Sequence, residues 1–321
     1  MRLADRDALG MCVPLYEENP SFSRQFMDRY QQSALAIAPV AYLLTCLTLA
    51  ALIAYPLQIM LQGGIDLHDL VSRGTEVLLV LGLIPLGRLL RLDKADLGAA
   101  VGPGRFLVLM ARGFCFGTLM LSLHMALLIA TDVRMILPER LELGRIFDAL
   151  QKALLVGLAV GLVEETVFRG FLFGSLRKKS GPIFAAAISS LFFAGLHFLK
   201  SDWHPAMEAT HWYTGFSLVT DAFRNLARID PSTFLALLTA GIFLSCVRLH
   251  LPASSLPLCI GIHAGWVFVI KSSKPFTKRT LDPFWSGFAG SFDGVIGYLS
   301  ASWLSVLIIL LAMSLRRKHS A

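Results

Sequence analysis

Residues 161–170 read Gly-Leu-Val-Glu-Glu-Thr-Val-Phe-Arg-Gly, with apolar residues on both sides. If this run crosses a bilayer, each charged side chain costs at least about 2.5–3.5 kcal/mol. A helix places Glu165 and Arg169 on one face, with the glutamate on the N-terminal side, which is the better order for an ion pair. Glu164 points about 100° away. We predict a functional use for these groups; the alternative is a structural ion pair that locks a helical bundle.

The composition is that of a membrane protein. The hydrophobic fraction is 55%, charged residues make up 16%, and the mean hydropathy is +0.64, whereas soluble proteins average about 25% charged residues. The net charge of +7 comes from short basic clusters beside apolar runs, which is typical of cytoplasmic loops rather than of a nucleic-acid-binding surface. The five cysteines form no C-x-x-C motif, so we expect neither a zinc ribbon nor a disulfide framework.

Eight apolar segments are long enough, or nearly so, to cross a hydrocarbon core of about 30 Å. They are 34–61, 75–91, 106–130, 147–176, 182–199, 233–250, 254–271 and 292–315. We predict an all-α, polytopic transmembrane bundle of about eight helices over 34–315, preceded by a cytoplasmic segment at 1–33. The protein is expected to be integral and multi-pass, in the inner or plasma membrane if the source is prokaryotic. The aromatic-rich segment 200–232 is either a surface loop or an interfacial helix near a substrate entrance.

The distribution of basic residues predicts that both termini are cytoplasmic. The basic residues at 316–318, the loop 92–105 and the cluster 177–179 all fall on that side. The loop 271–291 disagrees, because it is predicted to be external yet is rich in basic residues. These are Lys271, Lys274, Lys278 and Arg279.

Two histidines in later spans lie at a depth similar to that of the acidic pair. At 1.5 Å per residue, Glu165 lies about 18 Å, His197 about 22 Å and His263 about 13 Å from the inner ends of their spans. A boundary error of two to four residues shifts a depth by about 5 Å, so the three depths are compatible. His124 has no ionisable neighbour in its span, and we expect an ordinary bundle histidine. We predict a polar pocket formed by Glu164, Glu165, Arg169, His197 and His263.

Carboxylates beside imidazoles are suited to activating water. A desolvated glutamate has a raised pKa, and a neighbouring histidine can share its proton. Alternatively, two glutamates and two histidines can hold a divalent metal ion such as zinc, with a water in an open position. Either arrangement suits hydrolysis of a peptide bond.

Three motifs in chain order resemble those of the CPBP (Abi) family: Glu-Glu-x-x-x-Arg at 164–169, Phe-x-x-x-His at 193–197, and His263. This family contains the CAAX prenyl proteases of the second type and bacteriocin-processing enzymes. Its members are intramembrane endopeptidases with about eight transmembrane helices. The resemblance covers roughly 150–270 and implies a protease core at about 147–271.

The resemblance also implies roles for individual residues. Glu164 would be the base that activates water, with His197 as its partner. Glu165 and Arg169 would form a supporting pair, and His263 would complete the site. The family has been described both as metalloproteases and as metal-free glutamate proteases; we favour the second description and expect no cofactor, with zinc as the alternative.

One position departs from the family pattern. The family usually places Asn, sometimes Asp, four residues after the last histidine, and here that position is Val267. A valine side chain cannot hydrogen-bond, so stabilisation of the oxyanion in the transition state would need another donor.

We predict an intramembrane endopeptidase that cleaves a membrane-associated protein or peptide with water activated by Glu164. It is expected to contact the lipid bilayer and no nucleic acid. Val267 favours an alternative, a catalytically inactive family member that acts as a membrane scaffold or in bacteriocin immunity. A proton-coupled transporter is a third possibility, because intramembrane Glu and His also relay protons. The chain lacks the internal repeat that many transporters show.

Overall fold

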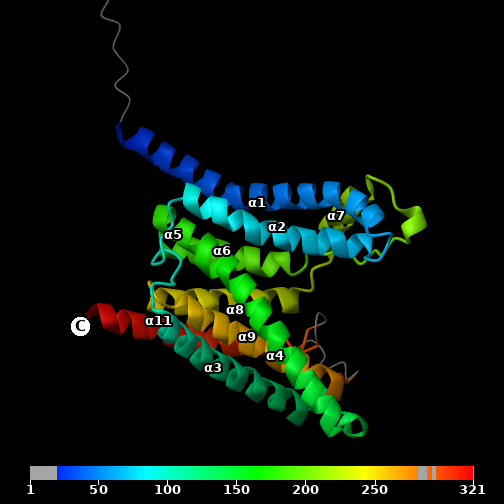
Figure 1. The fold of residues 1–321 in the computed structure, drawn as a ribbon. Helices are drawn as coiled ribbons and strands as arrows, with labels where there is room; N and C mark the ends of the chain where they lie inside the picture. The colour runs from blue at the N-terminus through cyan, green and yellow to red at the C-terminus, as the bar shows by residue number, and fades with distance from the viewer. Residues whose placement is uncertain (1–19, 281–287, 291–293, 321) are drawn as a thin grey trace, which may run out of the picture.

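The computed structural model describes residues 20–280, 288–290 and 294–320. Most of the predicted N-terminal segment 1–33 lies outside these residues. The described part is almost entirely helical, which confirms the all-α class (Figure 1). The long helices are α1 (Pro20–Met60), α2 (Leu67–Leu89), α3 (Pro103–Ala130), α4 (Leu143–Glu165), α5 (Phe173–Ser180), α6 (Pro182–Leu196), α7 (Thr214–Asn225), α8 (Pro231–His250), α9 (Leu256–Ser273) and α11 (Tyr298–Ser320).

Short elements connect these helices. A π-helical turn, η2, joins α4 to α5 without a break. Two three-residue strands pair antiparallel, with Arg134 opposite Arg279. The short elements are β1 (Arg134–Ile136), η1 (Pro138–Arg140), η2 (Thr166–Leu172), η3 (Met207–Ala209), η4 (Leu226–Arg228), η5 (Lys274–Phe276) and β2 (Thr277–Arg279).

Every predicted apolar segment contains a helix. Six spans among the described residues are long and apolar enough to cross a membrane, the longest being the continuous run α4–η2–α5; α6 and the apolar part of α11 are shorter. The chain is therefore a polytopic helical bundle. Figure 1 shows the first described turn of α1 and the last of α11 at the same end of the bundle. This placement agrees with an even number of crossings, while the cytoplasmic location of that end remains a prediction.

One predicted boundary differs from the structure. The second predicted span begins at residue 75, but α2 already begins at Leu67. Asp66 caps this helix by accepting a hydrogen bond from the backbone N–H of His68 at 3.3 Å. The first turns of α2 are polar, so hydropathy did not reveal them. The segment 200–232 contains the helix α7, which packs on α1; its position at the membrane interface remains a prediction.

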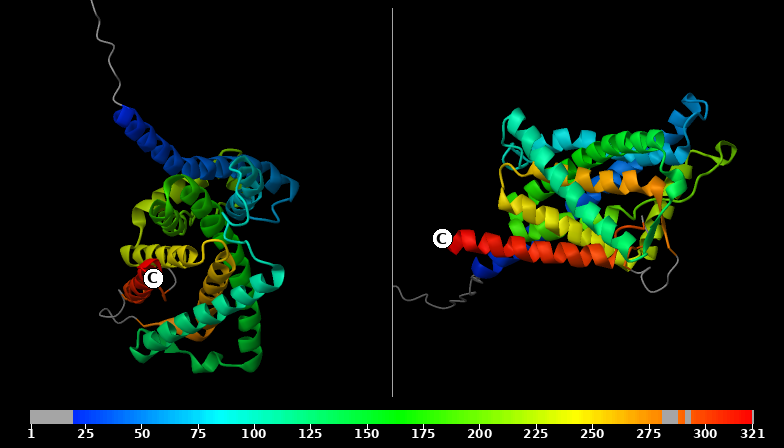
Figure 2. Two further views of the ribbon diagram at one scale, coloured as in Figure 1. Left: turned by 90° about the vertical axis from the view of Figure 1, so that its left-hand side faces the viewer. Right: turned by 90° about the horizontal axis from the view of Figure 1, so that it is seen from below.

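Three helices form the closely packed centre of the bundle. The helix α9 lies against both α3 and α4, and α4 crosses the bundle obliquely (Figure 1). Glycines allow the close approach: a Cβ on Gly157 would lie 2.7 Å from the Ala264 carbonyl oxygen, and one on Gly161 would lie 2.8 Å from that of Ile260. Small residues at helix contacts are a common basis of packing in membranes. Figure 2 shows α11 running along α8 on the side of the bundle away from α1 and α2.

Candidate functional site

The acidic pair lies where α4 changes to a wider helical form. Glu165 ends α4, and η2 follows with Arg169 in it. Such π-helical turns are frequent at functional sites. The predicted pairing is present: Arg169 Nη1 lies 3.2 Å from Glu165 Oε1, and both side chains are fully buried. The guanidinium also donates to the Gly241 carbonyl oxygen at 3.1 Å and lies 4.4 Å from the centre of the Phe193 ring.

Glu165 joins the arginine to the last histidine of the motif. Its Oε1 atom lies 2.9 Å from Nδ1 of His263 as well as accepting from Arg169. A carboxylate only accepts hydrogen bonds, so His263 must donate from Nδ1. Its Nε2 atom therefore carries a hydrogen only when the ring is doubly protonated.

Glu164 has a different environment from its neighbour. Its Oε2 atom lies 3.9 Å from Nε2 of His197 and 3.9 Å from Nε2 of His263, and its side chain is 28% exposed. Among the described residues this buried oxygen has no hydrogen-bond partner. The separations are too long for direct hydrogen bonds and are of a length at which a water can bridge two polar groups.

His197 follows the last residue of α6, and its Nδ1 atom lies 2.7 Å from the carbonyl oxygen of Phe193. The Phe-x-x-x-His spacing places the ring one turn beyond that carbonyl. Because a carbonyl only accepts, Nδ1 donates, and Nε2 of the neutral ring is left as an acceptor facing Glu164. The structure thus brings all five predicted residues together, whereas their catalytic roles remain predictions.

The sequence analysis did not identify Arg248, which is fully buried. Its guanidinium donates to the carbonyl oxygens of Arg169 at 3.2 Å, of Asp96 at 2.6 Å and of Pro252. Arg248 thereby ties the loop between α2 and α3 to η2. In the sequence it lies at the end of an apolar segment, where an arginine is expected to reach the membrane surface, so nothing distinguished it there.

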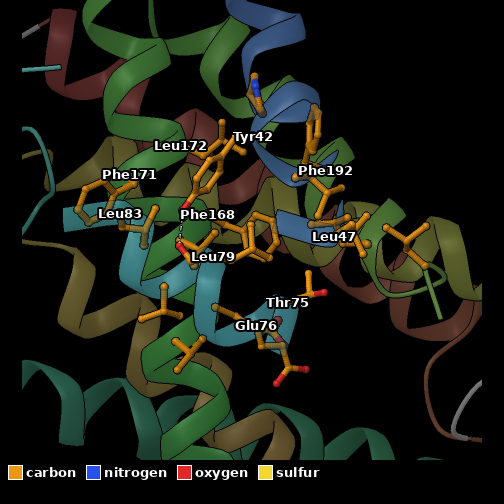
Figure 3. A pocket seen from close by; sticks show the side chains of 18 of the residues that line it. Tyr42, Leu47, Thr75, Glu76, Leu79, Leu83, Phe168, Phe171, Leu172 and Phe192 are labelled. Carbon is orange, nitrogen blue, oxygen red and sulfur yellow. Dashed lines mark hydrogen bonds between the residues drawn. The ribbon is translucent and has the colours of Figure 1, made fainter. Parts of the chain in front are cut away.

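Two cavities share Val160, Glu164 and His197 in their walls. The larger has a volume of about 690 Å³ and lies between the α1–α2 hairpin, α6 and η2. Figure 3 shows its mainly apolar wall, including Tyr42 of α1 and Phe168 of η2. Glu76 of α2 is an exception, a carboxylate inside a membrane-capable helix. The predicted span 75–91 placed Glu76 at the very end of the membrane segment, where charged residues are common, so the sequence analysis did not single it out.

The smaller cavity, about 280 Å³, lies among α3, α4, α8, α9 and α11. His263, Val267 and Lys271 of α9 line it at intervals of four residues. His124 also lines it, and its Nε2 atom lies 2.9 Å from the Val295 carbonyl oxygen, in agreement with a hydrogen-bonded bundle histidine. The apolar side chain of Val267 therefore faces the same space as Glu164.

The zinc alternative requires about three protein ligands around one ion. Within the described part of the chain, no group of three His, Cys, Asp or Glu side chains is placed to hold one ion. The zinc alternative therefore lacks a three-ligand cluster among these residues.

Comparison with known families gives one match. Residues 147–269 match the family model described as type II CAAX prenyl endopeptidase Rce1-like. This confirms the predicted resemblance to the CPBP family. No curated protein and no solved structure matches the chain.

The match extends from α4 to α9 and includes all five predicted site residues. Together with the membrane-capable helices, it identifies an integral, multi-pass membrane protein. The matched model is described as an endopeptidase, so the match supports a hydrolase in coarse terms. The α1–α2 hairpin lies outside the Rce1-like segment, yet it forms one side of the larger cavity.

Proposed function

We propose that this protein is an intramembrane endopeptidase that hydrolyses a peptide bond of a membrane-associated protein or peptide with water activated by Glu164. The observation that carries the proposal is the Oε2 atom of Glu164. It is buried, has no hydrogen-bond partner among the described residues, and faces two imidazole nitrogens where two cavities meet. The Rce1-like match supports the same class of reaction.

In the proposed reaction Glu164 accepts a proton from water, and the water oxygen bonds to the scissile carbonyl carbon. The carbonyl electrons move to the oxygen, giving a tetrahedral oxyanion. The C–N bond then breaks, and the leaving nitrogen takes the proton from Glu164. His197 supports this transfer because the acceptor Nε2 of its neutral ring faces the same carboxyl group. Once Glu164 has taken the proton, this nitrogen can accept a hydrogen bond from it. General acid–base catalysis of this kind contributes about 10²–10⁴ in rate.

The oxyanion requires a donor, and Val267 cannot supply one. We propose Nε2–H of a doubly protonated His263. Glu165 supports the imidazolium, because its carboxylate lies 2.9 Å from Nδ1. Arg169 is less suitable as the donor, since its guanidinium is bonded to Glu165 and Gly241.

The larger cavity supports a substrate with an extended apolar part. Its volume of about 690 Å³ lies in the range of ligand pockets, about 300–1,000 Å³. Its walls are mainly apolar, and it reaches Glu164 directly. A lipid-modified or membrane-inserted segment fits these properties.

The test compares membrane proteomes of cells that produce the wild type, Glu164→Gln, His197→Ala or the control Glu139→Gln, which changes an exposed glutamate outside the site. We expect a terminal fragment of the substrate to be lost only with the wild type and the control. A purified enzyme should process that substrate equally well with and without a metal chelator. Full processing by Glu164→Gln would show that the glutamate mechanism is wrong.

Val267 favours a second candidate, an inactive scaffold of the same family. On that reading no membrane protein loses a fragment, and wild-type and Glu164→Gln proteomes are the same. A large gain of cleavage in Val267→Asn, from a wild type without measurable activity, would also support the scaffold.

A further inference from the structure

We propose that His68 is a positioning residue for the candidate site and that its protonation tightens its hold. It would act through Ser201, four residues after His197, and so make the site sensitive to pH. This inference rests on the proposed function, because it assigns a regulation to the same site. It also extends that function to α2, a helix outside the Rce1-like segment.

A hydrogen bond joins the start of α2 to the chain that follows α6. Nε2 of His68 lies 3.0 Å from the Ser201 carbonyl oxygen, and because a carbonyl only accepts, Nε2 donates. His68, His197 and Ser201 all line the larger cavity. The bond therefore fixes the separation between two walls of this cavity, the α1–α2 hairpin and the segment that carries His197.

The connection from Ser201 back to His197 is short and well bonded. The backbone N–H groups of Phe198 and Leu199 donate into the last turn of α6, at 3.1 and 3.2 Å. Ser201 is buried, and its hydroxyl donates to Asp221 of α7 at 2.6 Å. Helix α7 in turn packs on α1 and α2 (Figure 1). A change in the hydrogen bond to the Ser201 carbonyl is therefore transmitted to His197 and not absorbed by a slack loop.

The second ring nitrogen of His68 makes the contact depend on charge. Nδ1 lies 3.5 Å from Oδ1 of Asp69, and among the described residues this buried nitrogen has no hydrogen-bond partner. While Nε2 donates, Nδ1 of the neutral ring is an acceptor that faces a carboxylate, which also only accepts. A proton on Nδ1 changes this opposition into an ion pair and makes the bond from Nε2 to Ser201 charge-assisted. Protonation of His68 therefore strengthens the contact.

A second histidine, on the loop itself, is arranged in the same way. Nδ1 of His204 lies 2.7 Å from Oδ2 of Asp66, the cap of α2, and the centres of the His68 and His204 rings lie 4.2 Å apart. Burial raises the pKa of Asp66, but hydrogen bonds from His204 and from the His68 backbone N–H, together with the charges of the two imidazoles, outweigh it and hold this pKa below its ordinary value. Asp66 is thus ionised in the range in which imidazoles titrate, about pH 5 to 8, and each ring has a carboxylate of its own.

The surrounding charges also favour protonated rings. The segments 66–76, 200–204 and 214–225 meet here, and α1 contributes no charged residue between 37 and 65. Five carboxylates and three basic residues lie in these segments: Asp66, Asp69, Glu76, Asp202 and Asp221, and Arg73, Lys200 and Arg224. On the predicted orientation this end of α2 faces outside. Acidification of the outer side is therefore expected to tighten the contact, and the gain is lost as the pH rises and the ring gives up its proton.

Hydrogen exchange of the purified full-length protein tests the contact without a substrate. Peptides covering 197–204 are followed by mass spectrometry at about pH 5.5 and about pH 7.5, on either side of the ordinary imidazole pKa of about 6.5, with correction for the intrinsic exchange rate at each pH. The variants are His68→Ala, His68→Gln and Asp69→Asn. The control His211→Gln changes an exposed histidine of the same loop that is not among the residues lining the larger cavity.

We expect the protection of 197–204 in the wild type and in His211→Gln to be about threefold to tenfold higher at the lower pH, since charge-assisted hydrogen bonds are roughly twice as strong as neutral ones. Glutamine can donate to the Ser201 carbonyl but cannot be protonated. His68→Gln should therefore keep the protection seen at the higher pH and lose the rise, and Asp69→Asn should reduce the rise. His68→Ala should lose protection at both pH values.

Protection of α3 and α9 should be the same in all variants, which shows that the fold is intact. The same rise in His68→Gln as in the wild type, or unchanged protection in His68→Ala, would overturn the proposal. His68→Gln and Asp69→Asn decide the question even if His68→Ala does not fold.

Turnover separates a positioning role from a merely structural one. The ratio of kcat for the wild type to kcat for His68→Gln should rise as the pH falls, with KM little changed, whereas a structural role gives the same ratio at every pH. Cleavage with a constant ratio would overturn the inference and leave the proposed function standing. The expected exchange pattern in a protein that cleaves no substrate would contradict the proposed function and leave the contact and its response to pH in place.

Discussion

Two regions of the bundle meet at Glu164, and they are packed in opposite ways. Where α3, α4 and α9 cross, backbones touch through glycines, and Glu165 and Arg169 are fully buried and paired. Between the α1–α2 hairpin and α6, large apolar side chains surround a cavity of about 690 Å³. The first region leaves no room for an added methyl group at its closest contacts, while the second has space for a ligand.

The closely packed region holds side chains in fixed positions, whereas the region around the larger cavity provides space. Glu164, Glu165 and His263, to which we assign roles in the proposed reaction, lie on the closely packed α4 and α9. The space that we propose for an apolar substrate lies beside them, against a hairpin outside the Rce1-like segment. Substitutions should therefore have unequal effects in the two regions.

The largest effect on stability is expected from breaking the buried pair. Arg169→Ala leaves the Glu165 carboxylate buried without its arginine, which typically costs about 3–5 kcal/mol. The membrane-inserted protein should fall in abundance, as measured by immunoblot of membranes. Among the described residues that line the larger cavity, no ion pair is buried to this extent. Glu76→Gln, which changes an exposed carboxylate there, is therefore the control and should leave abundance unchanged. Normal abundance of Arg169→Ala would contradict the assignment of the pair as structural support.

A matched pair of glycine substitutions tests the packing contrast directly. A Cβ on Gly117 of α3 would collide with the backbone of Ile262, whereas one on Gly82 of α2 would meet the hydroxyl end of Tyr42. Tyr42 borders the larger cavity, and moving it would break the hydrogen bond from its hydroxyl to the Leu79 carbonyl oxygen. We expect Gly117→Ala to destabilise by about 1–3 kcal/mol. Gly82→Ala should cost less, about 0.5–1.5 kcal/mol for that hydrogen bond, and both are measured as thermal inactivation in detergent. Equal losses in both variants would remove the contrast.

A smaller effect, on activity alone, is expected inside the smaller cavity. If His263 supplies the oxyanion donor, Val267→Asn should change kcat/KM by only a few fold, whereas His263→Ala should remove cleavage. Loss of one oxyanion donor can reduce the rate by about 10²–10³, so a donor truly missing in the wild type would reveal itself as a gain of that size in Val267→Asn. Single-turnover rates on an identified substrate distinguish the two outcomes.

The smallest effect is expected where the loop before α3 meets α5. Burial raises the pKa of Asp96, but hydrogen bonds from Lys178 and from the Asp93 backbone, with nearby positive charge, outweigh it and hold this pKa below its ordinary value. The ion pair, 2.7 Å long and partly exposed, should contribute less than about 1 kcal/mol.

A lowered folded-state pKa stabilises the protein above the unfolded value, about 3.9, and this stabilisation is lost as the pH falls through the lower folded value. Asp96→Asn should therefore be slightly less stable than the wild type at pH 7 and equally stable once Asp96 is protonated in the fold. A difference that stays constant down to that pH would exclude the ion pair as its cause.

Much of the architecture could be read from the sequence, because the bilayer forces apolar helices of nearly fixed length. The eight predicted segments all contain helices. The i,i+4 spacing correctly placed Arg169 beside Glu165, since a helical turn is a local geometry. The start of α2 could not be read in this way, because hydropathy marks membrane depth and not the end of a helix. Glu76 was overlooked for the same reason.

Three charges and two histidines stand out in the apolar runs of the sequence, because each is costly to bury in a membrane. The predicted depths allowed these residues to meet but did not require it; they meet because α9 packs against α4 through glycines. The same packing sets which atoms face one another. The tautomers of His197 and His263 depend on a carbonyl and on a carboxylate, and a cavity has no sequence pattern, because its walls come from helices far apart in the chain.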